Sequence, residues 1–158
     1  MKMVSVHLSR RSKRQRGQAL VEFSIAVIPF LMLLMGVFDL GRAIYAMNGT
    51  SEAAREIARV TSVHPCPSPF LPGCADLGSS TETANVVATQ RGLIPGFTFD
   101  TSTDIECVDV TDTVIPDVEC KAGDYIRVHV RAPFTPITPL VSAFGTHTFE
   151  SYSRIRIP

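Results

Sequence analysis

The sequence predicts an α+β protein in which a long N-terminal membrane-spanning helix precedes a small antiparallel sheet domain clipped by disulfides. Three observations lead to this fold class. An uncharged apolar run at residues 23–38 follows a basic leader, helical spacing of apolar residues continues to about residue 60, and the remaining chain holds short alternating stretches and all four cysteines. A chain of 158 residues accommodates one such domain and excludes a large multidomain enzyme.

The zero net charge hides a strong segregation of charge along the chain. Residues 1–17 contain six basic side chains and no acid, whereas the remainder contains nine basic and fifteen acidic residues. By the positive-inside rule, this leader stays in the cytoplasm and residues 39–158 cross the membrane. A basic cluster is also typical of nucleic-acid-binding arms, but the adjoining apolar run and the acidic body favour a topogenic role. We therefore expect no nucleic-acid partner.

The apolar run Phe23–Phe38 is slightly shorter than the roughly 20 residues that cross a bilayer core. Starting the span at Gln18 lengthens it to about 31 Å at ~1.5 Å per residue and brings Glu22 into or to the edge of the apolar layer. A cleaved secretory signal is the alternative, but it requires small residues in an A-x-A arrangement after the run. Charged residues, Asp39 and Arg42, flank the expected cleavage site instead, so we expect a single retained span in the lipid bilayer.

The junction between the leader and the apolar run holds the candidate functional residues. Gly17 closes the leader, Gln18 follows it, and Glu22 with Phe23 stands at the start of the apolar run. This arrangement resembles a type IV prepilin processing site, at which a membrane-embedded prepilin peptidase cuts after the glycine on the cytoplasmic side. The resemblance implies a mature chain that begins at Gln18.

The chemistry of Glu22 is consistent with such processing. An ionised carboxylate near hydrocarbon costs several kcal/mol unless it is paired. Cleavage after Gly17 would give Gln18 an α-ammonium with a reference pKa of about 8, and Glu22 can pair with that cation in its own chain or in a neighbouring subunit. On position alone, the alternative is a glutamate that reaches the headgroups or is favoured by the helix macrodipole.

The helical pattern continues beyond the apolar run. Aliphatic and small residues recur at three- and four-residue intervals on one face: Leu40, Ala43, Ile44, Met47, Ala54, Ile57 and Ala58. Oppositely charged residues pair at i,i+3 on the other face: Asp39 with Arg42, Glu52 with Arg55, and Glu56 with Arg59. Pro29 is expected to kink the helix or free a carbonyl, and Gly49 marks a plausible bend or break. We assign no chemical role to Asp39 or Arg42.

The N-terminal module resembles TadE-like proteins, the pseudopilins or minor pilins of the tight-adherence (Flp-type) pilus system of bacteria. The resemblance rests on GQALVEF at residues 17–23, Pro29 within the apolar run, FDLGR at residues 38–42 and the small-residue stretch at residues 53–59. The family often has glycine where this chain has Ile57. The resemblance implies a non-enzymatic, pilin-like subunit of the bacterial inner membrane, with a cleaved leader at 1–17, a helix at 18–60 and an exported domain at 61–158.

Its implied partners are a prepilin peptidase, other pilins or pseudopilins of a Tad-type system, the inner-membrane assembly platform and the lipid bilayer. Two alternatives stay open. The chain is an uncleaved bitopic scaffold of the pilus or secretion complex, or it is a periplasmic binding or enzymatic domain that signal peptidase releases.

The exported region begins with an irregular linker at residues 61–80, rich in proline, serine and glycine. Ser79–Glu82 forms a capping box for a short helix at Ala84–Arg91. We expect three or four antiparallel strands in all, and alternation marks three of them: Ile105–Val110, Tyr125–Arg131 with Ile126, Val128 and Val130 on one face, and Thr146–Ile157. The intervening Pro133–Phe144 is apolar and interrupted by prolines, which predicts a loop with a helical turn against the domain or the membrane surface.

The four cysteines, Cys66, Cys74, Cys107 and Cys120, all lie on the exported side. Short separations favour the pairs Cys66–Cys74 and Cys107–Cys120 among the three possible pairings. Each bond is expected to contribute on the order of 2–4 kcal/mol to a domain with a thin core. Structural zinc sites usually show C-x₂₋₄-C pairs, which these spacings do not match.

Motifs typical of enzymes are absent from the sequence. The four histidines are scattered, His129 is expected on a solvated strand face, and there is no G-x-S-x-G, H-E-x-x-H, phosphate loop or two-cysteine redox motif. We therefore expect no catalytic residue, no cofactor and no metal ion.

Overall fold

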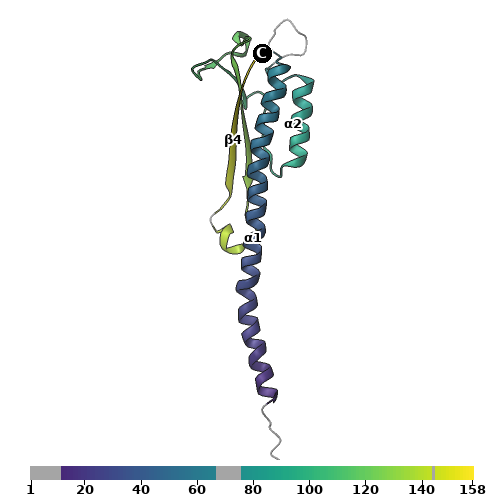
Figure 1. The fold of residues 1–158 in the computed structure, drawn as a ribbon, viewed down its shortest axis with the longest axis vertical. Coiled ribbons are helices and arrows are strands. Elements are labelled where there is room, and N and C mark those ends of the chain that lie inside the picture. Colours follow the sequence, from purple (N-terminus) through teal and green to yellow (C-terminus); the bar gives the residue numbers. More distant parts are fainter. Residues whose placement is uncertain (1–11, 67–75, 144) are drawn as a thin grey trace, which may run out of the picture.

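The computed structural model describes residues 12–66, 76–143 and 145–158. A single helix, α1 (Ser12–Val63), runs the length of the molecule, and its C-terminal half packs against a four-stranded antiparallel sheet (Figure 1). A second helix, α2 (Thr81–Leu93), lies beside α1 at the same end. The predicted α+β class, with a long apolar N-terminal helix and a small antiparallel sheet, is confirmed.

Helix α1 is continuous through both predicted weak points. Pro29 lies inside the helix, and the helix also passes without a break through Gly49, where a bend or break was plausible. A Cβ built on Gly49 would lie 3.1 Å from the side chain of Ile94, the residue that ends α2. The glycine therefore allows α2 to approach α1 closely, and this packing offsets its low helix propensity.

The sheet has the strand order β2-β1-β3-β4, and every described neighbouring pair is antiparallel. Its strands are β1 (Ile105–Val108), β2 (Val114–Ile115), β3 (Tyr125–Phe134) and β4 (His147–Arg156). The three predicted strands are confirmed with shifted ends. β3 is three residues longer than expected because all ten of its residues pair with β4.

The core lies between α1 and the inner face of the sheet. Ile126, Val128 and Val130 of β3 are fully buried on one face, as their alternation predicted. The small residues of α1 bring the helix close to the sheet, and Ile57 fills the space between them. Ile57 stands at the position where the family often has glycine, and in this chain it is one of the largest fully buried side chains.

Ser80 is the N-cap of α2, and its side chain accepts a hydrogen bond from the N–H of Thr83. The predicted capping box began one residue earlier, at Ser79, and was wrong. The Ser79 hydroxyl instead donates to the carbonyl of Asp76, so that Glu82 lies in the first turn of α2 but not at the capping position.

A disulfide joins Cys107 of β1 to Cys120, which follows a short 3₁₀ helix, η1 (Asp117–Glu119), and this predicted pair is confirmed. Cys66 is also disulfide-bonded. Its predicted partner, Cys74, lies outside the described residues.

Candidate functional site

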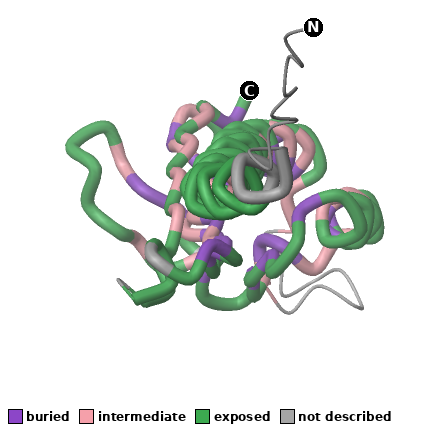
Figure 2. Tube along the Cα trace, turned by 90° about the horizontal axis from the view of Figure 1, so that it is seen from below, coloured by how far each residue is buried: buried purple, intermediate pink, exposed green. Residues whose placement is uncertain are grey.

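The N-terminal half of α1 projects from the domain as a free apolar rod, which we define as residues 18–38. Figure 2 looks along α1 from this end, and the near turns are exposed on all sides. Its exposed large side chains include Leu20, Phe23, Ile25, Phe30, Leu33 and Phe38. Helix α1 is the one described helix that is long and apolar enough to cross a membrane.

The predicted functional residues lie on the first turns of this rod. Gly17, Gln18, Glu22 and Phe23 are all exposed. Gln18 and Glu22 are four residues apart on one helix, so they lie on the same face, one turn from each other. Within the described part of the chain, no side chain forms a hydrogen bond or ion pair with Glu22.

At the other end of the rod, Asp39 connects α1 to the domain. The backbone N–H of Ile137 donates to both carboxylate oxygens of Asp39 at 3.1 and 3.0 Å, and the N–H of Thr138 donates to one of them at 2.7 Å. The guanidinium of Arg42 completes the set at 3.2 Å. We call this arrangement the Asp39 clamp. It binds α1 to the β3–β4 loop, which we define as the described residues between the two strands, 135–143 and 145–146.

The clamp holds Asp39 in its ionised form. The pKa of this carboxyl is lowered from its ordinary 3.8 to about 2, first by the Thr138 hydroxyl, then by the N–H groups of Thr138 and Ile137, and to a smaller extent by Arg42. The Thr138 hydroxyl has no well-formed hydrogen bond among the described residues, so the two N–H groups define the geometry of the clamp. Asp39 is only 5% exposed although it directly follows the apolar run.

Sequence reasoning missed this role of Asp39. The i,i+3 spacing with Arg42 predicted their ion pair. An acid next to an apolar run can also be interpreted simply as a charge at the membrane edge, so the spacing did not point to a structural role for Asp39. The partner N–H groups are 98 and 99 residues away, and backbone donors leave no residue-type signal in a sequence.

An apolar groove of about 360 Å³ lies beside the clamp, between α1 and the end of β3. Its walls combine α1 residues with two prolines and an aromatic ring of the domain, and the lining comprises Val37, Phe38, Gly41, Arg42, Tyr45, Ala46, Pro95, Pro133, Phe134 and Thr135. Arg42 contributes the charge at this groove. Its guanidinium lies 5.4 Å from the centre of the Phe134 ring, within cation–π range.

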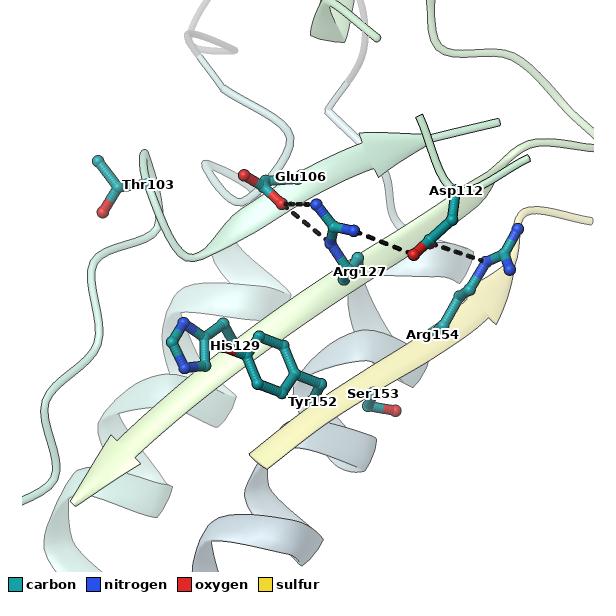
Figure 3. Close-up of a pocket in the computed structure, with 8 residues that line it drawn as sticks. All are labelled: Thr103, Glu106, Asp112, Arg127, His129, Tyr152, Ser153 and Arg154. Carbon is teal, nitrogen blue, oxygen red and sulfur yellow. Dashed lines mark hydrogen bonds and ion pairs between the residues drawn. The ribbon is translucent and has the colours of Figure 1, made fainter. Parts of the chain in front are cut away.

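A second hollow, of about 540 Å³, lies on the sheet face that points away from α1 (Figure 3). Arg127 forms ion pairs with Glu106 at 2.6 Å and with Asp112 at 3.3 Å, and Arg154 lies 3.7 Å from Asp112. The two guanidiniums and two carboxylates balance one another in charge. This hollow therefore has the character of a solvated sheet face crossed by ion pairs.

His129 is less exposed than expected. Its ring stacks on Tyr152 with centroids 4.1 Å apart, and its side chain is half-buried instead of solvated. The cross-strand register of β3 and β4 places the two rings opposite each other, which is a tertiary contact that the strand alternation alone does not reveal. Its Nε2 lies 3.5 Å from Glu150, so the pair is an ion pair only when the imidazole is protonated.

Comparison with known families agrees with the resemblance seen in the motifs. Residues 17–59 match the family model described as TadE-like protein. The match covers α1 from the junction to the segment that packs on the sheet, and the predicted family is confirmed over this segment. No curated protein and no solved structure matches the chain.

Proposed function

We propose that this chain is a non-enzymatic pseudopilin or minor pilin that takes part in assembly of a Tad (Flp-type) pilus, and so in surface adherence. The observation that carries the proposal is the free apolar rod with a single acid, Glu22, one helical turn from Gln18. The TadE-like match over residues 17–59 supports a Tad-pilus association for the same segment.

In this proposal, a prepilin peptidase cuts after Gly17, and the new α-ammonium of Gln18 becomes a partner for Glu22. The rod needs an apolar environment because its large side chains are exposed on all sides. The bilayer of the inner membrane provides that environment before assembly, and the rods of neighbouring pilins provide it afterwards. Pairing of Glu22 with the amine of a neighbour then selects subunits in register, because an unpaired carboxylate next to hydrocarbon is unfavourable.

The Asp39 clamp has a mechanical role in this proposal. In this proposal the assembly platform acts on the membrane-embedded end of α1, and the exported domain has to follow it. The clamp binds the β3–β4 loop to α1 directly after the rod. Farther along α1, its buried face packs against the sheet in the core of the domain. Rod and domain therefore move as one body when the subunit leaves the membrane.

The proposal is tested by intact mass and by a pair of charge-neutralising variants in the host. The mature protein should lack residues 1–17. Glu22→Gln should be processed normally but lost from sheared filaments, whereas the matched control Glu52→Gln, an exposed acid of the same helix, should behave like the unmodified protein. Incorporation of Glu22→Gln at the normal level would contradict the pairing role.

The alternative function is an uncleaved bitopic scaffold of the same envelope complex. The continuity of α1 from Ser12 through Gly17 is compatible with it, since the leader and the rod belong to one helix. A chain that still begins at Met1, together with indifference to Glu22→Gln, would favour the scaffold.

A further inference from the structure

We propose that the β3–β4 loop and the adjoining groove rest on the lipid headgroup layer, so that the protein contacts the bilayer at two places. The ligand class is the phospholipid surface on the side of the membrane that holds the domain. The inference rests on the membrane span in the proposed function and adds a second contact to it.

The Asp39 clamp fixes the height of this loop. A rod of residues 18–38 is about 31 Å long at ~1.5 Å per residue, close to the roughly 30 Å of a hydrocarbon core. Asp39 is the next residue along the helix, and the N–H groups of Ile137 and Thr138 bind its carboxylate directly. A loop held at this residue lies in the headgroup layer, which adds roughly 5–8 Å on each side of the core.

The composition of the loop suits this position. From Ala132 to Thr146 the sequence contains no charged residue, in a chain whose body is otherwise rich in acids. The side chain of Ile137 is 62% exposed although its own N–H is held by Asp39, and Val141 of the short helix α3 (Pro139–Ser142) is also exposed. Ile137 and Val141 therefore direct apolar side chains outward at the level where the helix leaves the bilayer.

Charge and aromatic residues at the same level favour a phospholipid surface over a protein partner. Arg42 and Tyr45 line the groove and are partly or largely exposed, and cations and tyrosines of this kind are enriched at membrane interfaces. Among the described residues at this level the one acid is Asp39, which is buried and paired with Arg42 and with two backbone N–H groups. The surface that these residues offer to the headgroups therefore has no exposed carboxylate and includes the half-exposed guanidinium of Arg42, whose charge Asp39 balances. Such a surface is not repelled by anionic lipids.

The chain contains no tryptophan, so single-tryptophan variants report local contact with lipid. Ile137→Trp tests the loop, with Val141→Trp as a second position in case the first disturbs folding. Phe30→Trp tests the span. Val110→Trp is the matched control, because Val110 is 72% exposed in the turn after β1, at the end of the ten-residue hairpin away from the loop. That separation is about 30 Å at ~3.3 Å per residue.

Each full-length variant is reconstituted in bilayers of phosphatidylethanolamine and phosphatidylglycerol whose lipid is unbrominated, brominated near the headgroup or brominated near the chain ends. Ile137→Trp should emit at shorter wavelength than Val110→Trp and should be quenched most by the bromine near the headgroup, whereas Phe30→Trp should be quenched most by the bromine near the chain ends. Adding Asp39→Ala to the Ile137→Trp variant should lower that quenching, because the loop is released from its height.

The outcomes separate this inference from the proposed function. In one outcome, Phe30→Trp is quenched, but Ile137→Trp and Val141→Trp are no more quenched than the control. This result would overturn the lipid contact of the loop and leave the span intact. A blue-shifted Ile137→Trp that is unquenched and depends on protein concentration would assign the loop to a second copy of the chain and also overturn it. Failure of Phe30→Trp to be quenched by lipid brominated near the chain ends would remove the span, and with it both proposals.

Discussion

Replacing Ile57 by alanine should open a cavity in the contact between α1 and the sheet. Ile57 is 0% exposed and belongs to the same core cluster as Val128 and Ala132 of β3. The substitution removes three carbon atoms, which corresponds to about 2.4 kcal/mol at ~0.8 kcal/mol per buried methylene. The unfilled volume raises the expected loss of unfolding free energy to roughly 3–4 kcal/mol.

Ile44→Ala is the matched control, because it makes the same chemical change in the same helix at a side chain that is 47% exposed. Its effect should stay within about 0.5 kcal/mol. Urea unfolding of the full chain in detergent micelles, followed by the near-ultraviolet circular dichroism of the tyrosines, measures both values. Equal losses for the two variants would refute the conclusion that α1 contributes to the core through its buried face at Ile57 and not through its exposed side chains such as Ile44.

Two further predictions concern the disulfide and the clamp. Replacing both Cys107 and Cys120 by alanine should lower the unfolding free energy by about 3 kcal/mol, because the disulfide closes a loop with a separation of 13 residues. Urea unfolding measures this loss. A urea midpoint equal to that of the oxidised protein would contradict the prediction. The Asp39 carboxyl has a folded-state pKa lowered from 3.8 to about 2, so its stabilisation is fully present above about pH 4 and is lost as the pH falls toward 2. Melting temperature should fall over that interval, and Asp39→Asn, which lacks this titration, should show a shallower fall; identical pH profiles would show that the clamp does not contribute.

Local patterns predicted several elements correctly because those elements are stabilised by neighbours within the same segment or by a uniform environment. The alternation in β3 identified its buried face, since Ile126, Val128 and Val130 all point into one core. The short separation of Cys107 and Cys120 identified their disulfide. The apolar run and its basic leader indicated the long helix, and the family model agrees over residues 17–59.

Predictions failed where a distant segment changes the local outcome. Gly49 predicts a bend or break in the helix, but the side chain of Ile94 packs against it and the helix continues without a break. His129 reads as solvated, but the register of β3 with β4 places it against Tyr152. In both cases, the decisive neighbour belongs to another element.

The sequence by itself determined the apolar rod, the position of Glu22 relative to Gln18 and the class of the fold, because these depend on residue type and on spacing along one helix or strand. Only the tertiary structure decided that Asp39 is buried in a clamp and that an uncharged loop lies where the helix leaves the apolar run. The backbone N–H groups that donate to the Asp39 carboxylate lie almost 100 residues away in the sequence, and backbone donors have no signature in the sequence. Their position results from the length and register of the β3–β4 hairpin, which packing against α1 holds in place.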